Sequence, residues 1–247
     1  RLRAYTYLYP LPNHDMDTFW TSPAMHAEAA SEMLSQGYTA LKFDPAGPYT
    51  MRGGHMPAMR DITMSEAMCQ AIRGAVGDEA DLLFGTHGQF STAGAIRLGQ
   101  ALEKYSPLWF EEPIPPDNVS EMAKVAQAVR IPVATGERLT TKAEFAPVLR
   151  EGAATIMQPA LGRVGGILEA KKIAGMAEAH YAQIAPHLYC GPVEGAANIQ
   201  LAASIPNFLL LESIQTWGGF HAELLKTPIR WEDGYVIVSD EPGLGIE

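Results

Sequence analysis

The sequence lacks the features that mark membrane, nucleic-acid-binding and secreted proteins. Its apolar runs stay well below the roughly 18 residues that a membrane-spanning helix needs, so no membrane segment is predicted. Lysine and arginine form no cluster and the formal net charge is −10, which argues against a nucleic-acid partner. The two cysteines, Cys69 and Cys190, have no metal or redox spacing and are interpreted as reduced thiols of a cytoplasmic protein.

The first residues do not resemble a signal peptide, and no initiator methionine precedes them. Residues 1–9 alternate in polarity like a strand and have neither an apolar core nor a cleavage site. We therefore expect the chain to begin partway through a longer protein. With 247 residues, 47% of them hydrophobic and 19% charged, the chain has enough apolar side chains for one large α/β barrel or two small domains.

Eight short apolar runs alternate with amphipathic segments along the chain. Each run is continuous rather than alternating in polarity, which is typical of strands in a parallel sheet that is covered on both faces. Strands are predicted at residues 4–8, 39–43, 81–84, 108–110, 133–135, 155–157, 183–185 and 208–211. Helices are predicted between them at residues 23–36, 63–76, 92–104, 119–129, 141–150, 165–180 and 191–203.

This alternation favours a closed (β/α)8 TIM barrel over an open doubly wound sheet. The repeated strand–helix order fits a barrel of this length, and we predict one barrel domain over residues 1–247. A dinucleotide-binding sheet would need a glycine-rich turn after its first strand, whereas residues 9–13 (YPLPN) contain no glycine. The longest insertion, residues 45–61, follows the second strand and is predicted to be a lid or substrate loop, with an ordinary surface loop as the alternative.

Polar residues follow the predicted strands at the end where such a barrel builds its active site. Polar groups are costly inside a core, so their regular placement predicts a functional site at the barrel mouth. The ends of strands two to eight carry, in order, Lys42 with Asp44, His87, Glu111, Glu137 with Arg138, Gln158, His187 and Glu212.

The spacing of these residues places several of them in one layer of the barrel. Glu111 and Glu137 are one strand–helix unit apart, Glu137 and His187 are two, and His187 and Glu212 are one. Two carboxylates on adjacent strands can share a hard cation, whose charge removes their mutual repulsion. Mg²⁺ suits such a pair because it leaves coordination positions open for water and substrate oxygens. Carboxylates at a helix start or on the surface are the alternative interpretation.

Five segments in fixed order resemble a known family. They are residues 110–113 (FEEP), 134–138 (ATGER), 165–167 (GGI), 185–187 (APH) and 211–212 (LE). Together they are similar to the barrel of the mandelate racemase/muconate lactonizing enzyme branch of the enolase superfamily, and within it to acid-sugar dehydratases of the galactonate dehydratase type. The resemblance covers about residues 37–247. Family members also carry an N-terminal α+β capping domain, which we expect to be absent from this chain.

The resemblance implies a reaction and roles for the residues at the mouth. A base removes the proton α to a carboxylate, a bound Mg²⁺ stabilises the enediolate, and loss of the β-hydroxyl then gives a 2-keto-3-deoxy acid. By position, Glu111 and Glu137 would be metal ligands and His187 a general base or acid. His87 would be the second acid/base group, unless it is an ordinary hydrogen-bonded barrel histidine. Glu212 would donate a hydrogen bond to the substrate carboxylate or enediolate.

The remaining candidates are contacts for a small acid sugar, an aldonate or aldarate. Lys42 would bind the substrate carboxylate or act as a base; the alternative is a strand-end lysine whose ammonium reaches solvent. Arg138 can pair with a substrate carboxylate. His14, just after the first strand, and Gln158 are further candidate contacts. Because members of the family form homo-oligomers, a homo-oligomer is expected here too.

Two positions depart from the family pattern. Gly85 stands where members usually have an aspartate as third metal ligand, so we expect Asp44, or else His87, to replace it. Ala160 stands where members with a strand-seven histidine have an aspartate that orients it, so His187 should be a poorer base. A dehydratase, which needs one good base and one acid, is therefore favoured over a racemase or epimerase of 2-hydroxy acids. A non-catalytic barrel that binds sugar acids is the third possibility.

Overall fold

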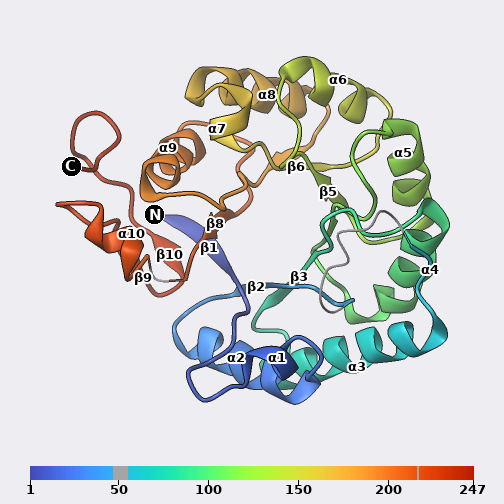
Figure 1. Cartoon of the computed structure of the whole chain (residues 1–247). Helices are drawn as coiled ribbons and strands as arrows, with labels where there is room; N and C mark the ends of the chain where they lie inside the picture. The colour runs from blue at the N-terminus through green and yellow to red at the C-terminus, as the bar shows by residue number, and fades with distance from the viewer. Residues whose placement is uncertain (47–54, 216) are drawn as a thin grey trace.

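Eight parallel strands form a closed barrel at the centre of the computed structural model, which describes residues 1–46, 55–215 and 217–247 (Figure 1). They are β1 (Leu2–Tyr7), β2 (Ala40–Phe43), β3 (Asp81–Gly85), β4 (Trp109–Glu111), β5 (Val133–Thr135), β6 (Ile156–Met157), β7 (Gln183–Ile184) and β8 (Leu211–Ser213). Strands β1 to β7 pair in chain order, and β8 pairs with β1. The Leu209 amide donates to the Ile184 carbonyl at 2.8 Å and so connects β7 with the segment before β8. The predicted (β/α)8 barrel is confirmed.

Helices surround the barrel and cover the outer face of its strands (Figure 1). The long ones are α2 (Pro23–Ser35), α3 (Met59–Val76), α4 (Thr92–Leu102), α5 (Val119–Ala128), α6 (Lys142–Arg150), α8 (Ile167–Ala179) and α9 (Pro192–Ala203). Short helices in the connections are α1 (Met16–Phe19), η1 (Glu103–Tyr105), α7 (Leu161–Val164) and α10 (Phe220–Glu223). Side-chain caps explain two of the helix starts, since Ser91 Oγ accepts a hydrogen bond from Gly94 N and Asn118 Oδ1 accepts one from Glu121 N. Each predicted helix overlaps one of the long helices.

The starts of two elements differ from prediction by more than two residues. Strand β8 begins at Leu211 rather than at residue 208, because the residues just before it make only isolated hydrogen bonds to Ile184. Helix α3 begins at Met59 rather than at residue 63, because the Asp61 carboxylate accepts a hydrogen bond from Ala58 N at 2.8 Å at the helix start. The predicted insertion at residues 45–61 is shorter as a result, and its residues 47–54 lie outside the described residues.

A C-terminal hairpin adds two strands that were not predicted. Strands β9 (Trp231–Glu232) and β10 (Tyr235–Val236) pair antiparallel, and β10 pairs with β1 (Figure 1). The hairpin turn packs closely on the segment before β2: a Cβ at Gly234, where φ is +76°, would lie 2.0 Å from the carbonyl oxygen of Gly37. Only glycine fits there. Two-residue strands are too short to show a polarity pattern, so no feature of the sequence indicated them.

Apolar side chains fill the barrel as well as surrounding it. The inner cluster consists of Tyr5, Ala40, Leu83, Trp109, Ala134, Ile156, Ala185 and Leu210. The rings of Tyr5 and Trp109 meet edge to face, with centroids 5.2 Å apart. A much larger cluster packs the strands against the helices. Because the interior is filled, a ligand binds at an end of the barrel rather than inside it.

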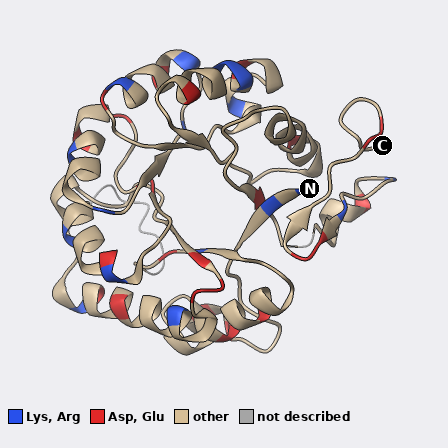
Figure 2. Cartoon of the chain, turned by 180° about the vertical axis from the view of Figure 1, so that it is seen from behind, with Lys and Arg blue, Asp and Glu red and all other residues tan. Residues whose placement is uncertain are grey.

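Charged side chains divide between the outer surface and one end of the barrel. Both signs are scattered over the outer helices (Figure 2). Among the lysines, arginines, aspartates and glutamates of the described residues, those that are buried all lie at or just after the carboxyl ends of strands: Lys42, Asp44, Glu111, Glu112, Glu137 and Glu212. Burying charge is costly, so this concentration marks a functional site. No helix in the described part of the chain is long and apolar enough to cross a membrane.

Candidate active site

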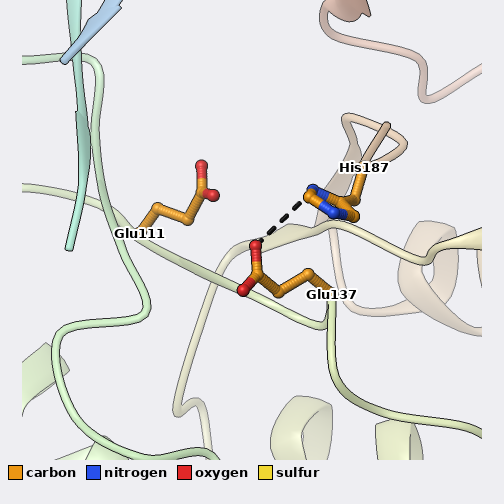
Figure 3. Close-up of side chains that lie close together, drawn as sticks. All are labelled: Glu111, Glu137 and His187. Carbon is orange, nitrogen blue, oxygen red and sulfur yellow. Dashed lines mark ion pairs between the residues drawn. The ribbon is translucent and has the colours of Figure 1, made fainter. Parts of the chain in front are cut away.

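Glu111, Glu137 and His187 each bring one possible metal-ligating atom to a common space at the barrel mouth (Figure 3). The three atoms all lie within 4.8 Å of one another. They are delivered by the carboxyl end of β4 and by the segments that follow β5 and β7. Glu137 Oε2 is buried and accepts no hydrogen bond, and it lies 3.5 Å from His187 Nδ1 in an ion pair. Two carboxylates and an imidazole in this arrangement fit a divalent cation.

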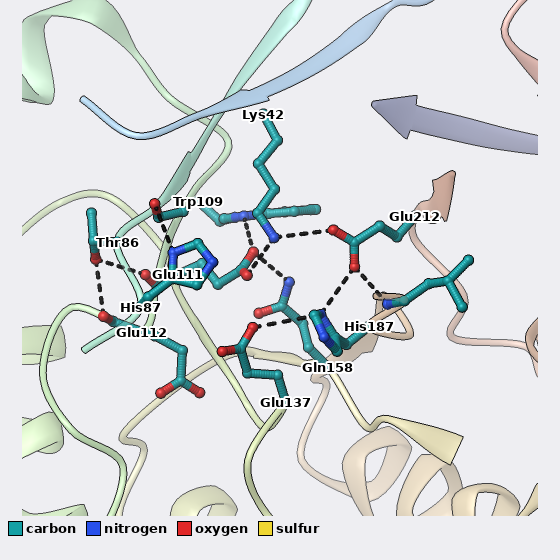
Figure 4. Close-up of polar contacts among 12 residues, drawn as sticks. Lys42, Thr86, His87, Trp109, Glu111, Glu112, Glu137, Gln158, His187 and Glu212 are labelled. Atoms are coloured by element: carbon teal, nitrogen blue, oxygen red, sulfur yellow. Dashed lines mark hydrogen bonds and ion pairs between the residues drawn. The ribbon is translucent and has the colours of Figure 1, made fainter. Parts of the chain in front are cut away.

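Three donors hold the Glu111 carboxylate in one orientation (Figure 4). Lys42 Nζ donates to Oε1 at 2.5 Å, and Gln158 Nε2 and Trp109 Nε1 donate to Oε2 at 2.7 and 3.1 Å. Burial raises the pKa of Glu111 above its usual range; Lys42 opposes this effect and Glu137 adds to it. Gln158, predicted as a substrate contact, is fully buried and is instead bound to this carboxylate.

Lys42 carries a buried positive charge between two carboxylates. Besides Glu111, its ammonium contacts Glu212 Oε1 at 3.1 Å, and the lysine side chain is only 2% exposed. Burial alone would lower the pKa of Lys42, but Glu111 and Glu212 raise it well above its usual value. Lys42 therefore stays protonated, and the alternative of an ammonium reaching solvent is wrong.

Glu212 has polar partners on three sides. In addition to Lys42, it accepts a hydrogen bond from Leu188 N at 2.6 Å and lies 3.1 Å from His187 Nδ1. Burial raises the pKa of Glu212, but Lys42 and His187 outweigh burial and hold it below its usual range. Glu212 is thus an ionised acceptor in this arrangement, and its role as a donor to substrate stays a prediction.

His187 has a carboxylate partner, Glu212, although Ala160 stands where an aspartate was expected to orient the ring. Burial would lower the pKa of His187, but Glu212 and then Glu137 raise it above its usual value. The direction of this pKa shift is opposite to the expectation that His187 is a poorer base. A carboxylate from β8 stands beside the ring in place of one from the end of β6.

Gly85 makes room for Lys42. A Cβ at this position would lie 2.6 Å from Lys42 Cε, far inside van der Waals contact. The lysine side chain passes close to this backbone on its way from β2 to Glu111 on β4. A side chain at position 85 would displace Lys42. An aspartate on β3 and the buried ammonium of Lys42 therefore exclude each other.

Asp44 does not replace the missing carboxylate. Its Oδ1 accepts a hydrogen bond from Ala46 N at 2.8 Å and its Oδ2 accepts one from Gln89 Nε2 at 2.9 Å. Burial raises the pKa of Asp44 to about 8 despite these bonds. The chain turns directly after β2, so the carboxylate is held by its own backbone and by the segment after β3. Among the described residues, the group close enough to hold a metal ion consists of Glu111, Glu137 and His187 and does not include Asp44.

His87 and Arg138 lie on neighbouring turns at the same mouth. Burial, with the charge of Lys42, lowers the pKa of His87 to about 4, so its ring is neutral near pH 7. His87 Nδ1 is 3.3 Å from the carbonyl oxygen of Gly85. Arg138 Nη2 donates to the carbonyl oxygen of His87 at 2.6 Å, and its Nε lies 3.5 Å from Glu137 Oε1. The roles of both residues toward substrate stay predictions.

His14 is held against helices outside the ring of strands. Its Nε2 contacts Glu28 Oε2 at 2.9 Å, and its ring stacks on Phe19 with centroids 5.8 Å apart. Its Nδ1 accepts a hydrogen bond from Leu11 N at 3.2 Å. The structure therefore does not support the predicted contact between His14 and substrate, because Leu11 N and Glu28 on α2 occupy both ring nitrogens.

A comparison with known families identifies this barrel. Residues 24–247 match the model of the enolase C-terminal domain-like family. The chain belongs to this family. Its membership agrees with the resemblance on the five segments listed above, and with the ligand group at the mouth of the enolase-type barrel.

The chain is similar to proteins that are named sugar-acid dehydratases, and to a solved structure that is named a mandelate racemase/muconate lactonizing enzyme. A D-gluconate/D-galactonate dehydratase from Picrophilus torridus is 38% identical over 218 residues, which is 88% of this chain and 54% of the relative. A D-xylonate dehydratase from Haloferax volcanii is 34% identical over 229 residues, 91% of this chain and 56% of the relative. A mandelate racemase/muconate lactonizing enzyme structure from Sulfitobacter sp. is 71% identical, with a TM-score of 0.96 over 100% of this chain and 62% of that one. The chain thus spans little more than half the length of these relatives.

Sequence reasoning missed Glu112 and Trp109. Burial raises the pKa of Glu112 to about 7, and Glu137 adds to this shift. Glu112 stands beside Glu111 in the FEEP segment, and a second glutamate at an apolar strand end was the available signal. Trp109 shares a strand face with Glu111, two residues on, which is the spacing that places side chains together in a strand.

Proposed function

We propose that this enolase-type barrel serves a Mg²⁺-dependent dehydratase of acid sugars, aldonates or aldarates, and that the product is a 2-keto-3-deoxy acid. The observation that carries the proposal is the group of Glu111, Glu137 and His187 beside the Lys42–Glu212 ion pair. The dehydratase names of the relatives from P. torridus and H. volcanii support the same reaction class.

Glu111 and Glu137 would hold the metal. Glu111 is fixed in orientation by its three donors, and Glu137 Oε2 has no hydrogen-bond partner. A bound Mg²⁺ would supply positive charge where negative charge develops on the substrate carboxylate. His187 would either complete the ligand group or remain free as the base.

His187 and His87 would transfer protons, and Lys42 would stabilise negative charge on the substrate. His187, whose pKa lies above its usual value, would take the proton α to the carboxylate. Lys42 stays protonated, so it would bind a substrate carboxylate or enediolate oxygen rather than act as the base. His87, which follows β3, would serve as the second acid/base group. Because its ring is neutral near pH 7, it would have to take up a proton before it could give one to the departing β-hydroxyl.

Incubating the complete protein with Mg²⁺ and a panel of acid sugars in D2O tests this proposal. We expect at least one aldonate or aldarate to give a keto acid, and the variants His187→Asn and Glu137→Gln to lose that product. Deuterium exchange with the hydroxyl retained would instead identify a racemase or epimerase. A protein that binds sugar acids but gives neither product nor exchange would contradict both enzyme functions.

A further inference from the structure

We propose that Glu112 is a positioning residue that holds the turn bearing Glu137 and thereby sets the affinity of the Glu111–Glu137 pair for a divalent cation. The inference rests on the proposed function, because it assumes that these two carboxylates share an ion. Glu112 is 0% exposed and directly follows Glu111 at the end of β4.

The Glu112 side chain binds the turn that precedes Glu137. Its Oε1 accepts hydrogen bonds from Thr135 Oγ1 at 2.7 Å and from Gly136 N at 3.0 Å. Thr135 ends β5, and Gly136 is the residue immediately before Glu137. Without Glu112, these two donors would be buried and unpaired, which is costly for a folded chain.

The turn at Gly136 depends on this outside support. Its φ is +131°, and a Cβ there would lie 2.7 Å from Phe145 Cε1 and 3.1 Å from Gln158 N. Glycine is therefore required, and glycine has the most freely rotating backbone of any residue. The carboxylate of Glu112 restricts this freedom at the position that directs Glu137 toward the shared space.

The backbone of Glu112 is fixed from both neighbouring strands. Its amide donates to the carbonyl of Ala134 on β5 at 2.9 Å, and its carbonyl accepts from Gly88 N at 2.6 Å and Thr86 Oγ1 at 2.9 Å. Its φ of +45° is uncommon for a residue with a side chain and persists only where surrounding contacts impose it. Glu112 thus connects the ends of β3, β4 and β5.

Glu112 acts on the site through the turn rather than as a ligand. Its carboxylate is not part of the group formed by Glu111, Glu137 and His187 and lies apart from the space that they share (Figure 4). Residues that orient metal ligands typically change metal affinity 10- to 100-fold when replaced, and Glu112 holds this relation to Glu137.

Isothermal titration of the complete protein and two Glu112 variants with Mg²⁺ tests whether the hydrogen bonds of Glu112 or its negative charge set the Mg²⁺ affinity. Glu112→Gln keeps an oxygen that can accept from both Thr135 and Gly136 but removes the charge, so its affinity should stay within about threefold of wild type. Glu112→Asp keeps the charge but is one methylene too short to reach both donors, so its affinity should fall about tenfold or more.

Thr135→Val tests the same contact without changing Glu112. It removes one of the two donors, so its Mg²⁺ affinity should lie between those of wild type and Glu112→Asp. Asn207→Ala, which removes hydrogen bonds to Ala174 and Ala182 before β8, is the control for general destabilisation and should leave the affinity unchanged.

The outcomes distinguish this inference from the proposed function. If wild type binds no Mg²⁺, the metal role of Glu111 and Glu137 is wrong and the inference fails with it. If wild type binds but Glu112→Asp and Thr135→Val bind equally well, only the positioning role is overturned. Equal weakening in Glu112→Gln and Glu112→Asp would also overturn it, because charge rather than position would then be responsible.

Discussion

Two ion pairs at opposite ends of the barrel have similar geometry and very different surroundings. At the amino ends, Arg3 Nη2 lies 2.7 Å from Asp81 Oδ2, and the two side chains are 33% and 41% exposed. At the carboxyl ends, Lys42 Nζ lies 2.5 Å from Glu111 Oε1, and the side chains are 2% and 1% exposed. Water screens the first pair and is excluded from the second.

Neither ion pair is explained by a large contribution to the stability of the fold. An exposed pair contributes about 0–1 kcal/mol, so Arg3 and Asp81 add little to folding. Burying two charges costs several kcal/mol per ion before their attraction is counted, so the Lys42–Glu111 pair is a poor way to stabilise a barrel. Its position at the mouth is consistent with a role in the proposed reaction rather than in folding.

Replacing Lys42 with methionine should have the largest effect. Glu111 and Glu212 would remain buried without their ammonium, so the free energy of unfolding should fall by about 3–5 kcal/mol in urea denaturation. Keto-acid formation by the complete protein should fall by about 10²- to 10³-fold. The matched control at the other end, Asp81→Asn, should cost less than about 1 kcal/mol and leave the rate unchanged. Equal losses in the two variants would contradict the distinction between the two ends.

Gly85→Ala should disturb the buried pair without removing it. The new methyl group would collide with Lys42 Cε, so we expect about 1–3 kcal/mol of destabilisation and a rate about 10²-fold lower. Gly74→Ala is the control, because a Cβ at this helical position meets nothing within 4 Å. It should stabilise the protein by roughly 0.5–1 kcal/mol. A wild-type rate in Gly85→Ala would show that Lys42 does not need the space.

Asp44→Asn should have the smallest effect on the rate, and its effect on stability should appear as a change in pH dependence. Burial raises the pKa of Asp44 from its ordinary value of 3.8 to about 8, so between these values the unfolded chain binds fewer protons than the folded one. Stability from this group therefore falls as pH rises from about 4 to 8. Urea denaturation at pH 5 and pH 8 should show a smaller decrease for Asp44→Asn than for wild type. A weaker Mg²⁺ affinity in the same variant would restore Asp44 as a ligand.

The sequence predicted the fold and the closeness of Glu111 and Glu137 well because both depend on regular spacing. Continuous apolar runs at strand–helix intervals predicted the parallel strands, and one such interval between Glu111 and Glu137 placed their carboxylates together. His187 was found by the same argument. In a closed barrel, the carboxyl ends of all strands meet at one mouth, so strand position alone is enough.

The errors concern residues whose direction is decided by contacts beyond the strand. Asp44 follows the end of β2, where a turn directs its carboxylate to Ala46 N and Gln89. His14 is held by α1 and α2, which spacing along the chain does not reveal. The partner of His187 was sought on β6 and lies on β8, because side chains from non-adjacent strands meet across the mouth.

The hydrogen-bonding edges of β1 have a consequence for how the protein is made. This strand pairs with β2, with β8 and, at its start, with β10. During synthesis on a ribosome, one edge of β1 can find its partners only after residue 211 and then residue 235 have been added. Until then the nascent chain exposes an unpaired edge that can join other strands. The barrel thus closes only after the residues of β8 and β10 have been synthesised.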